Sequence, residues 1–191
     1  MSVLRVIAGT ARSIPLFWVK SPDTRPMTDR VKTSLFDSLN PYLSDAFVLD
    51  LFAGVGGLGI EALSRGAAHC TFVERDRLCV DALRTNLHRT RLSDRATVYE
   101  RDVKTALTQM QSEVTPVDIV LFDPPFLLGK PPARKELEAL VQKLAEGFIE
   151  RGGLLVYHHD DETEGGFETR RLDVVETRNY GRNRITILKA V

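Results

Sequence analysis

The sequence predicts an α/β fold in which a mostly parallel sheet carries helices on both faces. Three observations predict it: apolar runs alternate with amphipathic helical patterns, a glycine-rich stretch follows the first central run, and the run 117–122 leads into Asp123. Pro124 and Pro125 end that run because proline lacks an N–H and has a fixed φ. Ligands of open α/β sheets bind beyond the carboxyl ends of the strands, so Asp123, Pro124, Pro125 and Phe126 are predicted to form the reactive site.

Length and composition indicate one domain with a small appendage. The chain has 191 residues, of which 43% are hydrophobic and 27% charged, as in ordinary globular proteins. No apolar run approaches transmembrane length and no signal-peptide pattern opens the chain, so no membrane association is expected. Cys70 and Cys79 fit neither a disulfide framework nor a CxxC pair, and we expect reduced cysteines in a cytoplasmic protein.

The formal net charge is zero, but its distribution is uneven. Residues 1–40 carry six Lys/Arg against three Asp/Glu, and residues 170–191 carry six against two. The centre, 41–169, carries 14 basic residues against 21 acidic ones. Basic ends on an acidic centre predict an anionic partner at the periphery, with ordinary solvated surface charge as the alternative.

Residues 1–40 are predicted to form a hairpin-and-helix extension, with the main domain at 41–191. The segments 3–7 and 14–19 are expected to pair as short strands around a turn. Two basic residues of this hairpin are candidate phosphate contacts: Arg5 and Arg12.

Thr28 is a plausible N-cap for the first helix, because a helical apolar pattern follows it. This helix is expected to end near Leu39, since Asn40 and Pro41 come next. The basic residues near its start would clamp a carboxylate or a phosphate, or form a solvated first turn; they are Arg25, Arg30 and Lys32.

A strand at 47–52 runs into a glycine-rich loop and a helix at 60–65. The loop contains the pattern G-x-G-x-x-G at Gly54, Gly56 and Gly59. With Glu74 twenty residues beyond the first glycine, the pattern also matches the dinucleotide fingerprint, so an NAD enzyme has to be considered. Asp50 favours S-adenosylmethionine instead, because an acid there receives the amino group of a methionine moiety and repels a pyrophosphate.

The next two strands are expected at 70–74 and 96–100, with a helix at 77–88 between them. Glu74 ends the first of these strands, where ribose hydroxyls need an acceptor. Asp102 follows the second and either accepts from an adenine amino group, caps the helix at 103–110, or does both.

Beyond the fourth strand, a loop with Lys130 and Arg134 is predicted to form part of the substrate rim. A helix at 135–148, a Gly152-Gly153 turn and a fifth strand at 154–158 are expected next, and then a hairpin of 172–177 and 184–189. The run His-His-Asp-Asp-Glu at 158–162 fits no zinc spacing, so we predict a solvated loop and no metal.

These features resemble class I S-adenosylmethionine-dependent methyltransferases, which have a Rossmann-like, seven-stranded, mostly parallel sheet. Four segments narrow the resemblance: Arg25-Pro26-x-Thr28-Asp29-Arg30-Val31, Asp50-Leu51-Phe52-Ala53-Gly54, Glu61-Ala62-Leu63-Ser64-Arg65-Gly66 and Asp123-Pro124-Pro125-Phe126. The chain closely resembles the bacterial 16S ribosomal RNA guanine-N2 methyltransferases, densely through Phe126 and loosely over 131–178. It departs from the family pattern at Ser13, Met27, Thr33 and Val55, outside the Asp-Pro-Pro-Phe tetrapeptide.

The resemblance implies a role for each site residue. The cofactor S-adenosylmethionine would be held by Arg25, Thr28, Asp50, Phe52, Ala53, Gly54, Gly56, Gly59, Glu74, Arg75, Asp102 and Val103. Asp123 and the Pro124 carbonyl would bind the target amino group, with Phe126 stacked on the guanine. Substrate RNA would be contacted by Arg5, Arg12, Arg30, Lys130, Arg134 and Arg182. The implied substrate is 16S rRNA in the small ribosomal subunit, and a monomer is the simplest expectation.

Several other functions compete with this interpretation. The tetrapeptide also serves amino methyltransferases of adenine or cytosine in DNA, although 191 residues leave no room for a sizeable target-recognition domain. A protein-glutamine methyltransferase would usually carry Asn in place of Asp123. A non-catalytic module for RNA or cofactor binding would not need the intact Asp-Pro-Pro-Phe tetrapeptide. An NAD dehydrogenase would have no function for these four residues either.

Overall fold

Seven strands form one mixed sheet in the order β3-β2-β1-β4-β5-β7-β6. The computed structural model describes residues 4–19, 27–111, 115–167 and 169–191. The strands are β1 Phe47–Leu51, β2 His69–Glu74, β3 Ala96–Glu100, β4 Val117–Phe122, β5 Ile149–Asp160, β6 Leu172–Tyr180 and β7 Asn183–Ala190. The first five run parallel, and β7 lies antiparallel between β5 and β6, so the predicted α/β fold is confirmed.

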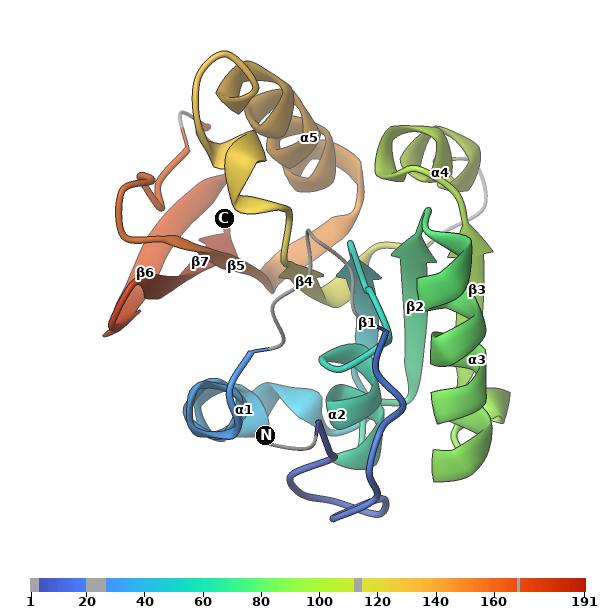
Figure 1. Ribbon diagram of the computed structural model, residues 1–191. Helices are drawn as coiled ribbons and strands as arrows, with labels where there is room; N and C mark the ends of the chain where they lie inside the picture. Colours follow the sequence, from blue (N-terminus) through green and yellow to red (C-terminus); the bar gives the residue numbers. More distant parts are fainter. Residues whose placement is uncertain (1–3, 20–26, 112–114, 168) are drawn as a thin grey trace.

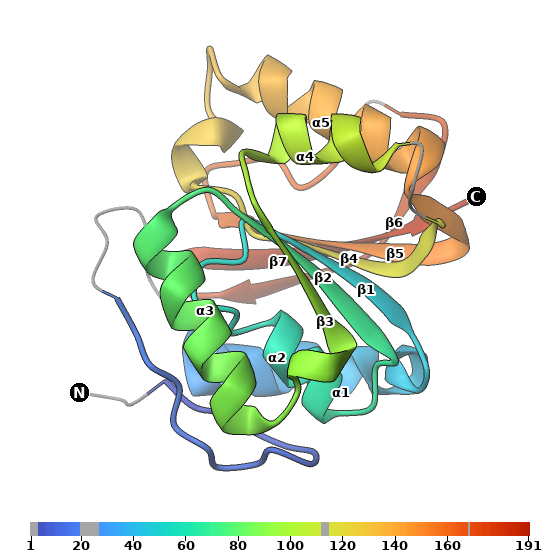
Figure 2. The same cartoon turned by 90° about the vertical axis from the view of Figure 1, so that its right-hand side faces the viewer.

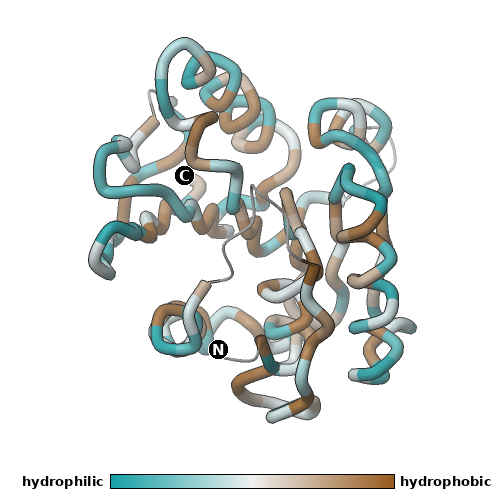
Figure 3. The backbone as a smooth tube through the Cα atoms, in the orientation of Figure 1, coloured by the Kyte–Doolittle hydropathy of each residue, from teal (hydrophilic) through white to brown (hydrophobic). Residues whose placement is uncertain are grey.

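The helices cover both faces of this sheet (Figures 1 and 2). On one face lie α1 Asp29–Leu43, α2 Gly59–Ser64 and α3 Arg77–Thr90, and on the other α4 Val103–Met110 and α5 Arg134–Gly147. Two short 3₁₀ turns complete the chain: η1 Ser93–Arg95 and η2 Phe126–Gly129. Each face has its own large hydrophobic cluster, because the central strands are buried on both sides. Figure 3 shows this pattern as apolar residues along the strands and mixed polarity along the helices.

The two halves of the N-terminal segment pair around a turn as predicted, but within the described residues they form no regular strands. Leu16 donates to the Leu4 carbonyl at 2.8 Å and Val6 to the Ile14 carbonyl at 3.0 Å, on either side of one isolated bridge. The amides of the turn side bond to α2 instead: two of them donate to the Glu61 carboxylate at 2.7 and 3.0 Å, and a third donates to Ser64 Oγ. This arm therefore satisfies its backbone partly across its own turn and partly on α2.

Helix α1 continues to Leu43, past the end predicted at Leu39, with Pro41 inside it. Leu39 and Leu43 are both fully buried in the cluster under the sheet. Their burial stabilises the last turn and outweighs the loss of one amide donor at proline. The boundary expected at residue 40 therefore falls within this helix.

Strand β5 is longer than predicted and begins at Ile149, with Gly152 and Gly153 inside it. A Cβ on Gly153 would lie 2.9 Å from the Asp118 carbonyl, so glycine permits β5 to approach β4 there. The other end of β5 contains His158 and His159, which are buried, so the solvated loop predicted for them was wrong. No metal-binding cluster occurs among the described residues.

The C-terminal hairpin is confirmed, with β6 and β7 joined by Gly181 and Arg182. Gly181 has a positive φ of 63°, as such a tight turn requires. Within the described chain, Cys70 and Cys79 are buried and unpaired, and none of its helices is long and apolar enough to cross a membrane.

Candidate active site

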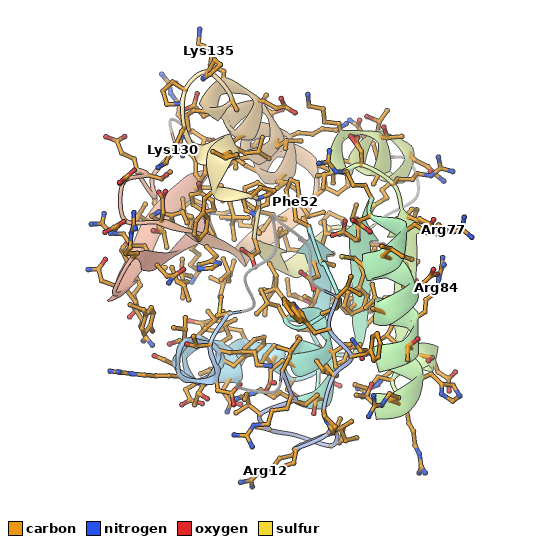
Figure 4. The ribbon with its side chains drawn as sticks, viewed as in Figure 1. Arg12, Phe52, Arg77, Arg84, Lys130 and Lys135 are labelled. Atoms are coloured by element: carbon orange, nitrogen blue, oxygen red, sulfur yellow. The ribbon has the colours of Figure 1, made fainter. Side chains whose placement is uncertain are left out.

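The register of the parallel strands brings the predicted site residues to one edge of the sheet. Leu51 pairs with Val73 and with Phe122, and Phe122 in turn pairs with Tyr157. The residues that follow these four are level with one another: Phe52, Glu74, Asp123 and His158. Figure 4 shows Phe52 near the middle of the molecule, at this edge.

The loop after β1 is a strained, tightly turned segment. Phe52 has a positive φ of 60°, which is costly for a residue with a side chain, and its ring packs on Phe122. Gly54 and Gly56 also have positive φ, and the Gly56 amide donates to the Ala53 carbonyl at 2.8 Å. The Gly54 amide is likewise bonded, to Glu74, so the turn is held by contacts within the protein.

Asp50 lies beneath this loop, 1% exposed, and its Oδ2 accepts from the Gly59 amide at 2.9 Å. Its Oδ1 is buried and has no hydrogen-bond partner among the described residues. Burial raises the pKa of Asp50 to about 8; the Gly59 bond opposes this, while the charges of Asp123 and Glu74 add to it. A cationic amino group above the loop would satisfy this carboxylate, so Asp50 fits a cofactor with a methionine end.

Glu74 ties the end of β2 to the glycine loop. Its Oε2 accepts from the Gly54 amide, and its Oε1 accepts from the amides of Arg75 and Asp76, all at 2.8 Å. Three amide donors hold the carboxylate in place at the sheet edge. Because Oε1 already accepts from two amides and Oε2 from one, Oε2 has a lone pair left for a hydroxyl donor of a ribose.

Asp102 caps α4 by accepting from the Thr105 amide at 2.8 Å, so this alternative of the prediction is confirmed. That bond is the main cause that lowers the pKa of Asp102, and the carboxylate itself is exposed. The Val103 side chain is buried in the hydrophobic cluster on this side of the sheet. Arg75 is exposed and close enough to Asp102 to contribute to its lowered pKa.

The tetrapeptide leaves β4 as a rigid corner. Asp123 Oδ1 lies 2.7 Å from His158 Nδ1 on β5. The Pro125 carbonyl accepts from Leu128, whereas no donor of the described residues reaches the Pro124 carbonyl. Phe126 opens η2, and its ring meets the His158 ring edge-on, with centroids 5.2 Å apart. The corner thus presents a carboxylate, a carbonyl and an aromatic ring together.

His158 belongs to this site and was not predicted from the sequence. The parallel pairing of β4 with β5 could have found it. Phe122 pairs with Tyr157, so the next residue of β5, His158, lies level with Asp123. The neighbouring acidic residues made 158–162 resemble a polar loop, and this concealed a strand end.

A groove of roughly 570 Å³ lies between α1 and β6, and Ser34 is at its centre. Arg178 Nη1 donates to the Ser34 carbonyl at 3.0 Å, and the Tyr180 hydroxyl donates to Ser34 Oγ at 2.6 Å. Arg30 lines the same groove, but so does the carboxylate of Asp37, and Arg178 is also paired with Glu176. The groove therefore combines two guanidinium groups with one acid and several hydroxyl groups.

The basic residues predicted to contact RNA differ in exposure and in the ion pairs they form. Arg182 is 85% exposed on the hairpin turn, while Arg5 pairs with Asp29. Arg12 lies at the far end of the molecule from Phe52 (Figure 4). Lys130 pairs with Asp160 and Glu162.

Arg134, which was predicted to contact RNA, is bonded within the protein. Its guanidinium bonds to Glu138 and to the carbonyls of Glu164 and Gly166, and it stacks on Phe167. These contacts fix the loop after β5 and occupy its donors. Thr28 is confirmed as the N-cap of α1, and Arg25 lies outside the described residues.

The strand order, the glycine loop after β1 and the antiparallel β7 define the class I methyltransferase fold. A solved structure named "Putative methyltransferase yhhF" from Escherichia coli matches 99% of this chain and 98% of its own, with a TM-score of 0.82 and 31% identity. The model of the family described as conserved hypothetical protein 95 spans residues 4–189, and the chain belongs to this family.

Two relatives of known sequence are also similar to the chain. It is 37% identical over 187 residues to the "Putative rRNA methyltransferase YlbH" of Bacillus subtilis, an alignment that covers 97% of this chain and 98% of that protein. It is 41% identical over 126 residues to the ribosomal RNA small subunit methyltransferase D of Escherichia coli, which covers 66% of this chain and 62% of that protein. These names indicate an rRNA methyltransferase.

Proposed function

We propose that this protein transfers a methyl group from S-adenosylmethionine to the exocyclic N2 of a guanine in 16S rRNA. The observation that carries this proposal is the corner after β4, where Asp123 and Pro124 follow directly on the pairing of Phe122 with Leu51, just before the glycine loop. Two acceptors side by side suit an amino group with two N–H bonds. The small-subunit methyltransferase name of the E. coli relative supports rRNA as the acceptor.

The loop and the strand ends account for cofactor binding. The buried, unpartnered Oδ1 of Asp50 would stabilise the amino group of the methionine end, and Glu74 would accept from the ribose. The ends of β3 and α4 would surround the adenine through Asp102 and the Val103 backbone. Thr28 and Arg25 would close the methionine end from the α1 side. When bound, S-adenosylmethionine supplies an electrophilic methyl group.

The chain's own contribution is to align and activate a weak nucleophile. The lone pair of a guanine amino group is delocalised into the ring, so the nitrogen attacks poorly. Accepting both N–H bonds at Asp123 and at the Pro124 carbonyl favours a pyramidal nitrogen whose lone pair points towards the methyl group. After transfer, the nitrogen carries a surplus proton, which leaves through Asp123 or a nearby water. Phe126 would hold the unstacked base by its face.

The RNA would approach across the basic ends of the chain. The groove between α1 and β6 offers Arg30 and Arg178, and the hairpin turn offers Arg182. Residues 1–40 would serve as an extension that contributes to both RNA and cofactor binding. We propose that a monomer acts in the cytoplasm on guanine within the assembled subunit, since so small a chain has little surface for recognising sequence.

Transfer of a labelled methyl group from S-adenosylmethionine tests this proposal. The acceptors are unmodified small subunits, naked 16S rRNA and duplex DNA, each with a heat-treated enzyme control. Label in the subunit RNA is the expected result. Label in DNA alone would support an amino methyltransferase of DNA, and cofactor binding without any transfer would indicate a binding module.

A further inference from the structure

We propose that His158 is a positioning residue: it fixes Asp123 through one carboxylate oxygen and so leaves the other oxygen turned towards the substrate amino group. This inference rests on the proposed function, because Asp123 needs positioning only if it binds an acceptor base. It adds to the tetrapeptide a residue that lies 35 positions further along the chain.

Three contacts fix the imidazole ring. Nδ1 lies 2.7 Å from Asp123 Oδ1 on β4, and Nε2 lies 3.2 Å from Asn183 Oδ1 at the start of β7. The Phe126 ring of η2 packs against it at an interplanar angle of 77°. His158 itself is 5% exposed, so the ring cannot turn without losing these partners.

Asp123, by contrast, is open on its other side. Its side chain is 31% exposed, and within the described residues only His158 donates to it. A carboxylate on the single bond of an aspartate rotates freely unless one oxygen is held. The contact with His158 therefore orients the second oxygen without occupying it.

The partners of His158 also set its charge. Both ring nitrogens face oxygen acceptors, and an imidazole donates from both only when it is protonated. Burial lowers the pKa of His158, but the charge and hydrogen bond of Asp123 and the bond to Asn183 outweigh burial and raise it overall. The other groups near this pair are Asp50 behind Asp123, and His159, which turns to Thr186 on the opposite side of β5.

A protonated His158 has a defined consequence for the reaction. Its N–H lies against one oxygen of the Asp123 carboxylate as a charge-assisted hydrogen bond, so the other oxygen is available to accept from the incoming amino group. It cannot take the surplus proton of the product, because both of its nitrogens already carry one. That proton leaves through the free oxygen of Asp123 to water.

Substitution of His158 tests this inference, with His159 as the matched control. His159 lies in the same strand, is 2% exposed and bonds to Thr186 at 2.9 Å, away from Asp123. We expect His158→Leu to lower kcat about 30-fold while the KM for cofactor and RNA stays within about twofold. His158→Gln keeps a donor towards Asp123 and should lose only about fivefold, and His159→Gln should keep kcat within about twofold. A His158→Leu enzyme that turns over as fast as wild type would overturn the inference.

Nitrogen NMR of the His158 ring separates this inference from the proposed function. Both ring nitrogens should be protonated at about pH 7, and the Asp123→Ala substitution should remove that signature. A neutral ring in the wild-type protein contradicts the ion pair, whatever the acceptor is. If wild type transfers no methyl group but the ring is charged, the proposed function fails and the pair stands.

Discussion

At the scale of single residues, two carboxylates at one sheet edge have opposite environments. Asp50 is enclosed and has one oxygen without a partner, whereas Asp123 is partly open and paired with a histidine. Asp50 can therefore bind a cation, and Asp123 can accept a hydrogen bond from an N–H donor. Both residues could be singled out from the sequence, because each stands next to a chain-breaking motif at a strand end.

The substitution Asp123→Ala tests the proposed acceptor site. It removes the carboxylate that accepts from the amino group, so we expect kcat to fall by about 10³-fold. Cofactor affinity should change little, because the glycine loop and Asp50 are untouched. Turnover near that of the wild type would contradict the assignment; calorimetric titration with S-adenosylhomocysteine provides the control.

Proton release measures the role of Asp50. The pKa of Asp50 is raised from its ordinary value of 3.8 to about 8 in the fold. Its contribution to the stability of the fold is therefore fully present below pH 3.8, and it is lost as the pH rises through 8. A bound ammonium group would restore the anion, so cofactor binding at about pH 7 should release close to one proton.

Calorimetry in two buffers of different ionisation enthalpy would detect that proton. Asp50→Asn should bind more weakly and release none. The same release from the variant would show that another group titrates.

At the scale of elements, the loop between β1 and α2 joins the fold to the site. The sequence predicted the loop and its glycines, but two features needed the packed sheet. Phe52 has a left-handed backbone that sequence patterns assign to glycine. His158 was hidden because its partner is set by the register of β4 and β5, a long-range property.

Two glycines of this loop should respond differently to alanine. A Cβ on Gly59 would lie 2.3 Å from the Phe72 ring and 2.8 Å from Asp50 Oδ2, so Gly59→Ala should cost several kcal/mol, about 3 or more. A Cβ on Gly54 meets nothing within 4 Å, so Gly54→Ala should cost only the strain of its positive φ, about 1–2 kcal/mol.

Because the open space above Gly54 is the proposed cofactor position, Gly54→Ala should still weaken cofactor binding. Urea denaturation and titration with S-adenosylhomocysteine separate the two effects. Equal losses of stability in both variants would contradict this description of the loop.

At the scale of the whole molecule, a buried ion pair between α1 and α2 holds the arm. Glu61 is fully buried and contacts Lys32 at 3.4 Å and Arg65 at 2.9 Å while it accepts from two amides of the arm. The sequence predicted that the two halves of this arm pair around a turn, and they do so through a few backbone bonds. It did not predict the side chains of α2 that accept from the arm, because no local pattern reveals them.

Removing Glu61 should therefore destabilise the whole chain. Glu61→Ala leaves the buried Lys32 with only the Arg5 carbonyl as a partner among the described residues and removes the acceptor of two part-buried amides. We expect a loss of about 3–5 kcal/mol in the free energy of unfolding. The control is Glu100→Ala. It removes an exposed ion pair between Glu100 on β3 and Arg84 on α3 and should cost less than about 1 kcal/mol. Chemical denaturation compares them, and similar costs would show that the arm is not held in this way.

The identity of the methylated nucleoside tests the central claim most directly. Small subunits labelled by the enzyme would be digested to nucleosides and separated by chromatography with mass detection. The proposed reaction predicts that all label elutes as N2-methylguanosine, and that none appears with the Asp123→Ala enzyme. Label in another nucleoside, such as N6-methyladenosine, would contradict guanine N2 as the acceptor.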